Sequence, residues 1–141
     1  REIRLGVAVD TPRGLVVPVL REPGQKSLLQ LAKELGSLAD RAREGKLAPN
    51  EMTGASFTVT NLGALGVEHF SPIINPPQVA ILGLGRATQM PVWQGSAFVP
   101  RLSLPLSLSF DHRALDGADG ARFLHWLGEA LESPLFSSLE V

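Results

Sequence analysis

The most regular alternation of apolar and polar side chains lies between residues 102 and 110. Leucine or phenylalanine occupies every second position, and serine fills most of the positions between: Leu102, Leu104, Leu106, Leu108 and Phe110 against Ser103, Ser107 and Ser109. A period of two predicts a single β-strand with one apolar face and one hydroxyl-bearing face. Pro105 lies on the serine side and has no N–H to donate, so this strand should be an edge strand or should bulge there.

Two amphipathic helices are predicted. Apolar residues at helical spacing run from Leu28 to Ala42. Ser27 and Gln30 stand at the spacing of a capping box before this run, and Gly45 is placed to end it. A second helix is expected from about residue 117 to 132, stopped by Pro134. The buried stripe of this second helix is expected to comprise Ala121, Phe123, Leu124, Leu127, Ala130 and Leu131.

Further strands are predicted from β-branched and apolar content. They cover residues 3–10, 14–20, 56–61, 79–84 and a short pair at 92–93 and 97–99. The first two should form a hairpin, because proline and glycine lie between them. The run 79–84 is apolar throughout, which suits a strand buried on both faces. Residues 62–77 are rich in glycine and proline and have no period, so we expect a shaped loop.

Composition limits the possible functions. The 141 residues fit one domain, and 44% hydrophobic with 19% charged residues argues against disorder. A net charge of −1 argues against a phosphate-backbone binder. The absence of cysteine excludes a disulfide framework, a thiolate metal site and a cysteine nucleophile. No apolar run reaches the roughly 18 residues of a membrane span, and the first residues do not resemble a signal peptide. Because the chain opens directly on an apolar alternation, we expect a fragment of something longer.

The sharpest candidate for chemistry is the segment from Asp111 to Gly117, between the alternating strand and the last helix. His112 would be mounted on a rigid strand end, and an imidazole can accept and return a proton near neutral pH. Asp116 can fix the turn, cap the helix or hold Arg113. The alternative interpretation is a salt-bridged turn with a helix cap and an exposed histidine.

A second candidate is Thr58-Val59-Thr60-Asn61. Thr58 and Thr60 share one face of the predicted strand, and a hydroxyl or amide there can donate to a developing oxyanion. The alternative is that threonine is present only because it is a good strand residue.

Other chemistries fit less well. His112, Asp116 and His125 do not have a recognised metal-ligand spacing, and His125 is expected to pack or lie on the surface. A hydrolase triad lacks the G-x-S-x-G nucleophile elbow. Gly83-Leu84-Gly85 is too short for a dinucleotide-binding fingerprint.

Residues 111–117 resemble the D-H-R-x-x-D-G signature of dihydrolipoamide acyltransferases, the E2 core components of 2-oxo acid dehydrogenase complexes. Three further segments, 6–19, 57–63 and 72–83, are similar to the paired strands, the F-T-[IV]-[ST]-[SN]-x-G segment and the proline-rich loop of that family. They occur in the family's order over nearly the whole chain.

The resemblance implies the fold of chloramphenicol acetyltransferase, an α/β (α+β) two-layer sandwich in which helices pack on a mixed sheet. It also implies a homotrimer that builds a larger cage, with active sites between subunits. Residues 1–141 would be the C-terminal part of one incomplete catalytic domain. Its N-terminal portion, the lipoyl domain and the peripheral-subunit-binding domain would lie outside this chain.

The same resemblance assigns roles to residues at matching motif positions. His112 would deprotonate the thiol of coenzyme A, Thr60 would donate to the oxyanion, and Asp116 would organise the loop and support His112. Three residues would line the coenzyme A path: Asp10, Asn61 and Gly85. Coenzyme A would be a substrate, the lipoyl group would arrive on a separate domain, and no metal would take part.

The implied function is an acyltransferase that moves an acyl group, acetyl by preference, between dihydrolipoamide and coenzyme A. The implied partners are the E1 and E3 components, reached through the missing domains, without nucleic acid or membrane. The expected location is the cytoplasm, or the mitochondrial matrix in a eukaryote. Two alternatives stay open: a non-catalytic core or scaffold subunit, and a related trimeric acetyltransferase for a small hydroxyl acceptor. The latter group usually has a second histidine at the position of Asp111.

Overall fold

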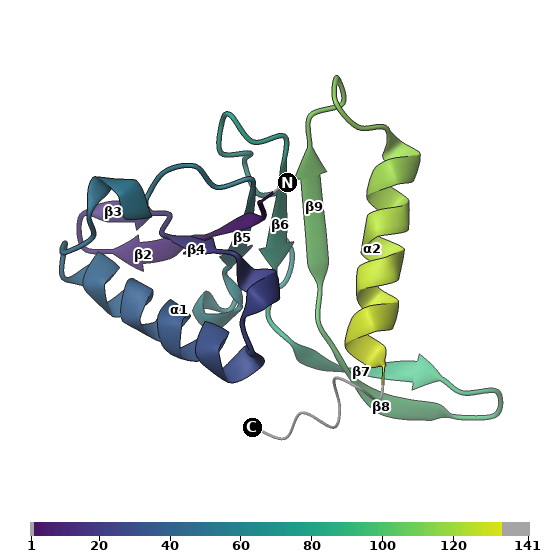
Figure 1. Cartoon of the computed structure of the whole chain (residues 1–141). Coiled ribbons are helices and arrows are strands. Elements are labelled where there is room, and N and C mark those ends of the chain that lie inside the picture. Colours follow the sequence, from purple (N-terminus) through teal and green to yellow (C-terminus); the bar gives the residue numbers. More distant parts are fainter. Residues whose placement is uncertain (1, 134–141) are drawn as a thin grey trace.

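The structure, a computed structural model, describes residues 2–133 and centres on a five-stranded mixed sheet (Figure 1). The strand order is β4-β1-β5-β6-β9, with β1, β5 and β6 parallel and the two outer strands antiparallel. The strands are β1 (Arg4–Val7), β4 (Val19–Arg21), β5 (Phe57–Asn61), β6 (Ala80–Leu84) and β9 (Leu106–Phe110).

Two further ribbons and two long helices complete the described part. The ribbons are β2 (Val9–Thr11) with β3 (Gly14–Val16), and β7 (Thr88–Trp93) with β8 (Phe98–Ser103). The helices are α1 (Leu28–Arg43) and α2 (Gly117–Glu132), and three short 3₁₀ turns cover Pro23–Gln25, Pro49–Glu51 and Gly63–Leu65. In residues 2–133, neither long helix combines the length and apolar content needed to cross a bilayer.

The predicted N-terminal hairpin is confirmed, but it is divided between two sheets. β1 pairs with β4, whereas β2 pairs with β3 in a separate ribbon. The division falls where Ala8 donates its N–H to the carbonyl of Val59 in β5. Pro18, which has no N–H, interrupts the opposite strand, and its carbonyl accepts the N–H of Val7.

Helix α1 begins and ends where the sequence predicts. The Ser27 hydroxyl accepts the N–H of Gln30, and the Gln30 side-chain oxygen accepts the N–H of Ser27. The last helical residue is Arg43, and Gly45 follows with a φ of +69°. Leu38 and Ala42 are the buried residues of this helix, which packs on β2 and β4.

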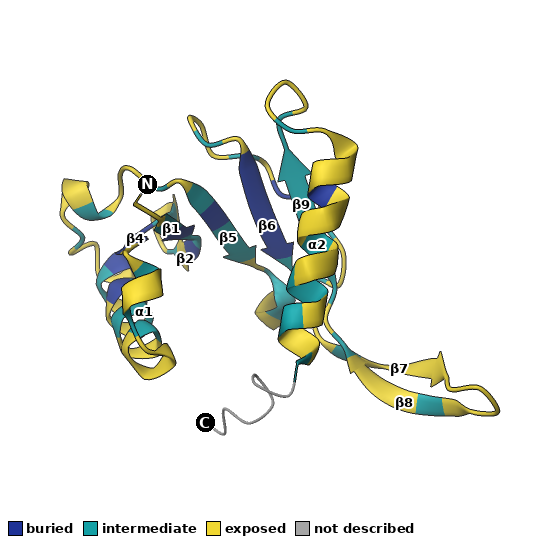
Figure 2. Ribbon diagram, turned by 45° about the vertical axis from the view of Figure 1, so that its right-hand side comes forward, coloured by how far each residue is buried: buried dark blue, intermediate teal, exposed yellow. Residues whose placement is uncertain are grey.

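The strand register separates two different faces of the sheet. On one face, Phe57 of β5 contacts Phe123 of α2, with ring centroids 6.0 Å apart. On the other face, Gly83 lies beneath Phe70 and Pro72 of the loop between β5 and β6. The central strand β6 is therefore covered on both sides, as predicted, and Figure 2 shows it as the most buried strand of the sheet.

The predicted single strand over residues 102–110 is wrong, because the chain breaks at Leu104 and Pro105. Leu102 and Ser103 end β8, which pairs with β7, and β9 starts at Leu106. Proline cannot donate to a ladder, and the Pro105 carbonyl accepts the N–H of Gly85 at 2.9 Å. The β7–β8 hairpin is consequently longer than predicted, whereas the expected edge position is confirmed for β9.

The predicted buried stripe of α2 is mostly not buried. Phe123 and Leu131 are 36% and 45% exposed, and Gly120 alone is buried within the helix. The reason is that α2 lies along the edge strand β9, and none of the helices and strands of residues 2–133 forms a further layer outside it (Figure 2). Trp126 on the same helix is 63% exposed. The described part of one copy therefore leaves much of this helix uncovered.

Candidate functional site

His112 lies in the exposed turn between β9 and α2, at the end of both elements (Figure 1). Its imidazole lies 5.8 Å from the ring of Phe110, and within residues 2–133 it has no hydrogen-bond partner. The preceding residue anchors the turn, because the N–H of Asp111 donates to the carbonyl of Val79 at 2.8 Å. The imidazole is exposed, so another molecule can contact it.

An ion pair flanks this histidine. Arg113 donates from Nε and Nη2 to the carboxylate of Asp111, at 2.9 and 2.6 Å, and its backbone N–H donates to the same carboxylate at 2.9 Å. The hydrogen bond from the Arg113 side chain lowers the pKa of Asp111 to about 2. Asp111 is therefore ionised at neutral pH, and Arg113 is held by Asp111 rather than by Asp116.

Asp116 is the N-cap of α2. Its carboxylate accepts the N–H of Asp119 at 2.8 Å, and the carboxylate of Asp119 accepts the N–H of Asp116 at 3.3 Å. The residue therefore fixes where the turn stops and the helix starts. The ion-paired turn, the helix cap and the exposed histidine of the simpler interpretation are all present, and a catalytic His112 would be carried by the same turn.

Thr60, Asn61 and Asp10 line one cavity of about 420 Å³. The cavity lies between the first strands, α1 and the end of β5, and Arg43 also borders it. Asn61 accepts the N–H of Gly63 at 2.8 Å through its side-chain oxygen. Thr60 is half-buried, and its hydroxyl has no bonded partner in the part of the chain that the structure describes.

Gly85, the third residue predicted for the coenzyme A path, is packed against backbone. A Cβ at this position would lie 1.9 Å from the carbonyl oxygen of Glu68 and 3.3 Å from Pro105. The residue is buried and is not among those that line the cavity with Thr60. Close packing gives a structural reason for glycine there.

The two halves of the predicted site lie at opposite ends of the sheet. Thr60 pairs with Gly83 near the end of β6, whereas Phe110 pairs with Ala80 at its start. With about 3.3 Å per residue along a strand and about 4.8 Å between strands, the Cα atoms of Thr60 and Phe110 are roughly 14 Å apart. His112 lies two residues further away. One copy of the chain does not bring the histidine and the threonine together.

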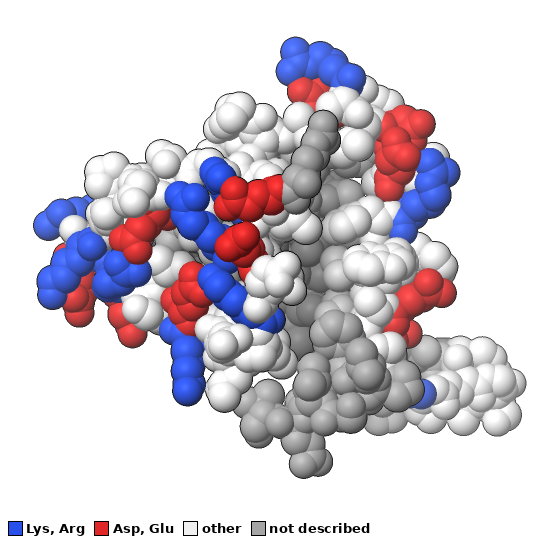
Figure 3. Space-filling view, viewed as in Figure 1, with Lys and Arg blue, Asp and Glu red and all other residues white. Residues whose placement is uncertain are grey.

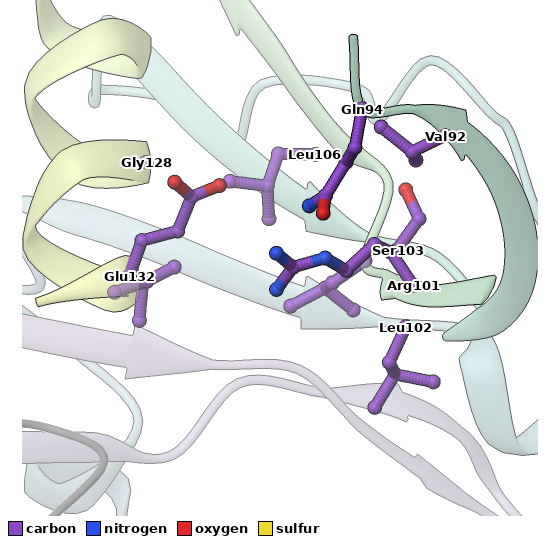
Figure 4. Close-up of a pocket in the computed structure, with 10 residues that line it drawn as sticks. Val92, Gln94, Arg101, Leu102, Ser103, Leu106, Gly128 and Glu132 are labelled. Atoms are coloured by element: carbon purple, nitrogen blue, oxygen red, sulfur yellow. The ribbon is translucent and has the colours of Figure 1, made fainter. Parts of the chain in front are cut away.

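A larger cavity of about 880 Å³ lies between the β7–β8 hairpin, the start of β9 and the end of α2. Figure 4 shows the side chains of Gln94 and Arg101 directed toward each other in it, with Glu132 on the helix side. None of the predicted site residues lines this cavity, and no sequence pattern indicated it. Across residues 2–133, this cavity included, no group of three or more histidines or carboxylates could hold a metal ion.

Charge is distributed unevenly over the molecule. Figure 3 shows acidic and basic side chains interspersed around α1, whereas the projecting β7–β8 hairpin is almost free of them. Between Thr88 and Ser103 the only charged residue is Arg101. Trp93 and Phe98 of this hairpin are 57% and 68% exposed. The hairpin therefore presents apolar side chains on an almost uncharged surface.

The mixed sheet with two helices is the chloramphenicol acetyltransferase-like fold of acyltransferase catalytic cores. Residues 1–139 match the 2-oxoacid dehydrogenases acyltransferase catalytic domain, and the chain belongs to this family. The predicted resemblance and fold class are both confirmed.

Similar proteins include the dihydrolipoyllysine-residue acetyltransferase components of the pyruvate dehydrogenase complexes of Haemophilus influenzae and Pseudomonas aeruginosa. They are 54% and 57% identical over 129 residues, which are 92% of this chain and 23% and 24% of those proteins. The chain thus spans about a quarter of the length of these curated relatives.

Solved structures show the same likeness. One is Azotobacter vinelandii dihydrolipoamide acetyltransferase, studied for the roles of a serine, a histidine and an asparagine in its catalytic mechanism (56% identity, TM-score 0.91, 93% of this chain and 54% of that one). Another is the cubic core of the pyruvate dehydrogenase multienzyme complex (55% identity, TM-score 0.91, 93% and 54%). A probable dihydrolipoamide acetyltransferase from Listeria monocytogenes is 34% identical, with a TM-score of 0.92 over 99% of this chain and 59% of that one.

Proposed function

We propose that this chain carries the acyl-transfer residues of a dihydrolipoamide acetyltransferase, which moves an acetyl group between dihydrolipoamide and coenzyme A. One observation carries the proposal. In the A. vinelandii enzyme the studied serine and histidine are 52 positions apart, and the histidine and asparagine are four apart. Thr60, His112 and Asp116 have the same spacing here. Threonine preserves the hydroxyl of serine, and aspartate, like asparagine, can cap a helix.

His112 acts as the general base. A free thiol with a pKa near 8.5 is mostly protonated at neutral pH, so the imidazole takes the proton of coenzyme A as its sulfur attacks. The attack on the thioester carbonyl of acetyl-dihydrolipoamide forms a carbon–sulfur bond and a tetrahedral oxyanion. The Thr60 hydroxyl donates to that oxyanion. The intermediate then expels the dihydrolipoamide sulfur, which takes the proton back from His112.

The site forms between two copies of the chain. His112 and Thr60 lie at opposite ends of one sheet, and both side chains lack partners in the described residues. The exposed apolar residues of α2 and of the β7–β8 hairpin offer surface for another copy. A homotrimer that builds a larger assembly satisfies these requirements and agrees with the cubic core formed by a similar protein.

The remaining site residues take supporting roles. Asp10 and Asn61 border the cavity with Thr60 and line the approach of coenzyme A. Asp116 supports His112 through the cap that ends its turn. Gly85 contributes only by letting the loop at Glu68 pack closely on the end of β6. The lipoyl group and the E1 and E3 components interact through domains outside this chain.

The direct test is an assay of the full-length protein with coenzyme A and acyl-dihydrolipoamide donors carrying acetyl, succinyl or isobutyryl groups. We expect acetyl-coenzyme A to form fastest. A faster reaction with another donor would change the substrate class, and no turnover with any donor would favour a non-catalytic core subunit.

The location of the site between copies is tested by mixing two inactive variants. An assembly made only of His112→Ala copies lacks the histidine in every site, and one made only of Thr60→Val copies lacks the threonine hydroxyl in every site. A Thr60→Val copy still carries the histidine, and a His112→Ala copy still carries the threonine. When equal amounts are dissociated and reassembled together, about one quarter of the sites join the two retained halves. We expect activity to reappear only in the mixture. If the two variants assembled correctly but their mixture had no activity, then His112 and Thr60 of one site would come from the same copy, or one of them would not take part in the mechanism.

A further inference from the structure

Thr58 is the only polar side chain in the buried set of residues 2–133, with 1% of its surface exposed. It lies on β5 two positions before Thr60, and its hydroxyl donates to the side-chain oxygen of Gln78 at 2.6 Å. Gly6 on the neighbouring strand leaves space for this hydroxyl, because a Cβ there would lie 2.8 Å from it. The bond is therefore enclosed by the fold.

Gln78 lies in a segment whose backbone makes few hydrogen bonds to the neighbouring strand β5. The pairing of β6 with β5 begins only at Ile81, so residues 78 and 79 precede that ladder. The backbone N–H of Gln78 donates to Asn75 within its own loop. Among the hydrogen bonds of residues 2–133, the side-chain bond to Thr58 is the one that joins Gln78 to β5.

The same segment supports the turn that carries His112. The ladder between β6 and β9 ends at Phe110, and beyond it the N–H of Asp111 donates to the carbonyl of Val79. Val79 is adjacent to Gln78, and Asp111 is adjacent to His112. A continuous connection therefore runs from Thr58 through Gln78 and Val79 to the residue before the imidazole.

We infer that Thr58 and Gln78 are positioning residues for the transfer reaction, because their hydrogen bond fixes the turn of His112 relative to β5. The inference rests on the proposed function. A general base acts within hydrogen-bond distance of the proton it removes, and a displacement of about 1 Å can cost as much as 10²-fold in rate. β5 also carries Thr60. The same strand therefore positions the threonine of one site and, through Gln78, the histidine that the copy contributes to another site.

The experiment compares Thr58→Val with Thr58→Ser in the full-length protein. Valine has the shape of threonine but cannot donate, whereas serine retains the hydroxyl. We expect Thr58→Val to lower kcat about tenfold while the KM for coenzyme A stays within about twofold, because the base is displaced and the substrate cavity is not. Thr58→Ser should recover most of the rate. A purely structural role would lower the amount of folded protein without this split between kcat and KM.

Gln78→Leu removes the acceptor of the same hydrogen bond, at a residue that is only half-buried. If Thr58→Val does not fold, this variant tests the positioning role instead. It should show the same loss of kcat, and the double variant should be no slower than the slower single one, because both remove one interaction. Unchanged kcat in the folded variants, or no recovery with serine, would overturn the inference. If the unaltered protein transfers no acyl group, the proposed function fails instead, so the two failures are distinguishable.

Discussion

The aromatic ring of Phe110 packs directly against the Cα of Gly120. A Cβ on residue 120 would lie 2.7 Å from the Cε1 atom of that ring, closer than non-bonded carbon atoms approach. Phe110 also lies beside the imidazole of His112. The first turns of α2, the end of β9 and the candidate base are therefore joined through one aromatic side chain.

Gly120→Ala is expected to lower both stability and turnover. The added methyl group forces the Phe110 ring to move, and overpacking of this kind costs about 1–3 kcal/mol, more than alanine gains by its helix propensity. The matched control is Gly128→Ala on the same helix, where no atom of residues 2–133 outside the helix lies within 4 Å of the new Cβ. That control should raise the free energy of unfolding, measured by urea titration. Equal effects of the two substitutions would contradict the proposed contact.

His112→Ala in the full-length protein is expected to lower the rate of acetyl transfer about 10²–10⁴-fold, because the coenzyme A thiol loses its general base. His125→Ala is the control, since His125 is an exposed histidine of α2 whose neighbour is Glu129. Its rate should match that of the unaltered protein in the same assay. A normal rate for His112→Ala would remove this residue from the mechanism.

The ion pair between Asp111 and Arg113 predicts a pH dependence. The pKa of Asp111 is lowered from 3.8 to about 2, so the pair stabilises the folded state above about pH 4 and loses this effect as the pH falls through about 2. Arg113→Gln should return the pKa of Asp111 toward its ordinary value. NMR titration of the Asp111 carboxyl group in both proteins measures the difference. The same pKa in both would show that another group stabilises the carboxylate.

Asp116→Ala is expected to destabilise the protein by about 0.5–2 kcal/mol, because α2 loses the acceptor that caps its first turn. Asp116→Asn should cost far less, since asparagine caps equally well. Thermal unfolding of both variants distinguishes the cap from a charge effect. If asparagine and alanine were equally harmful, the negative charge rather than the cap would be the important property.

Local signals in the sequence predicted those elements whose boundaries depend on local interactions. The start of α1 follows from the reciprocal bonds of Ser27 and Gln30, and its end follows from Gly45. Likewise, the start of α2 follows from Asp116, and the burial of β6 follows from its uninterrupted apolar composition. These features require no knowledge of distant segments.

The features that were missed depend on which segments become neighbours. Alternation across residues 102–110 describes the faces of a strand but not its pairing partner, so it continues through Pro105 although the partner changes from β7 to β6. The motif correctly located His112 in the turn after β9 and Asp116 at the start of α2. That Thr60 lies at the opposite end of the sheet follows from strand order, which no local pattern gives, and only the family resemblance, with its sites between subunits, led us to expect it.

The position of His112 and Thr60 at opposite ends of the sheet also affects how many sites an assembly can have. If copies associate head to tail, a dimer that does not close completes one site. It leaves one His112 and one Thr60 without a partner half-site at its two ends. In a closed ring every His112 meets a Thr60 of the next copy, so the number of complete sites equals the number of copies. The turnover rate per chain would then show whether the ring has closed.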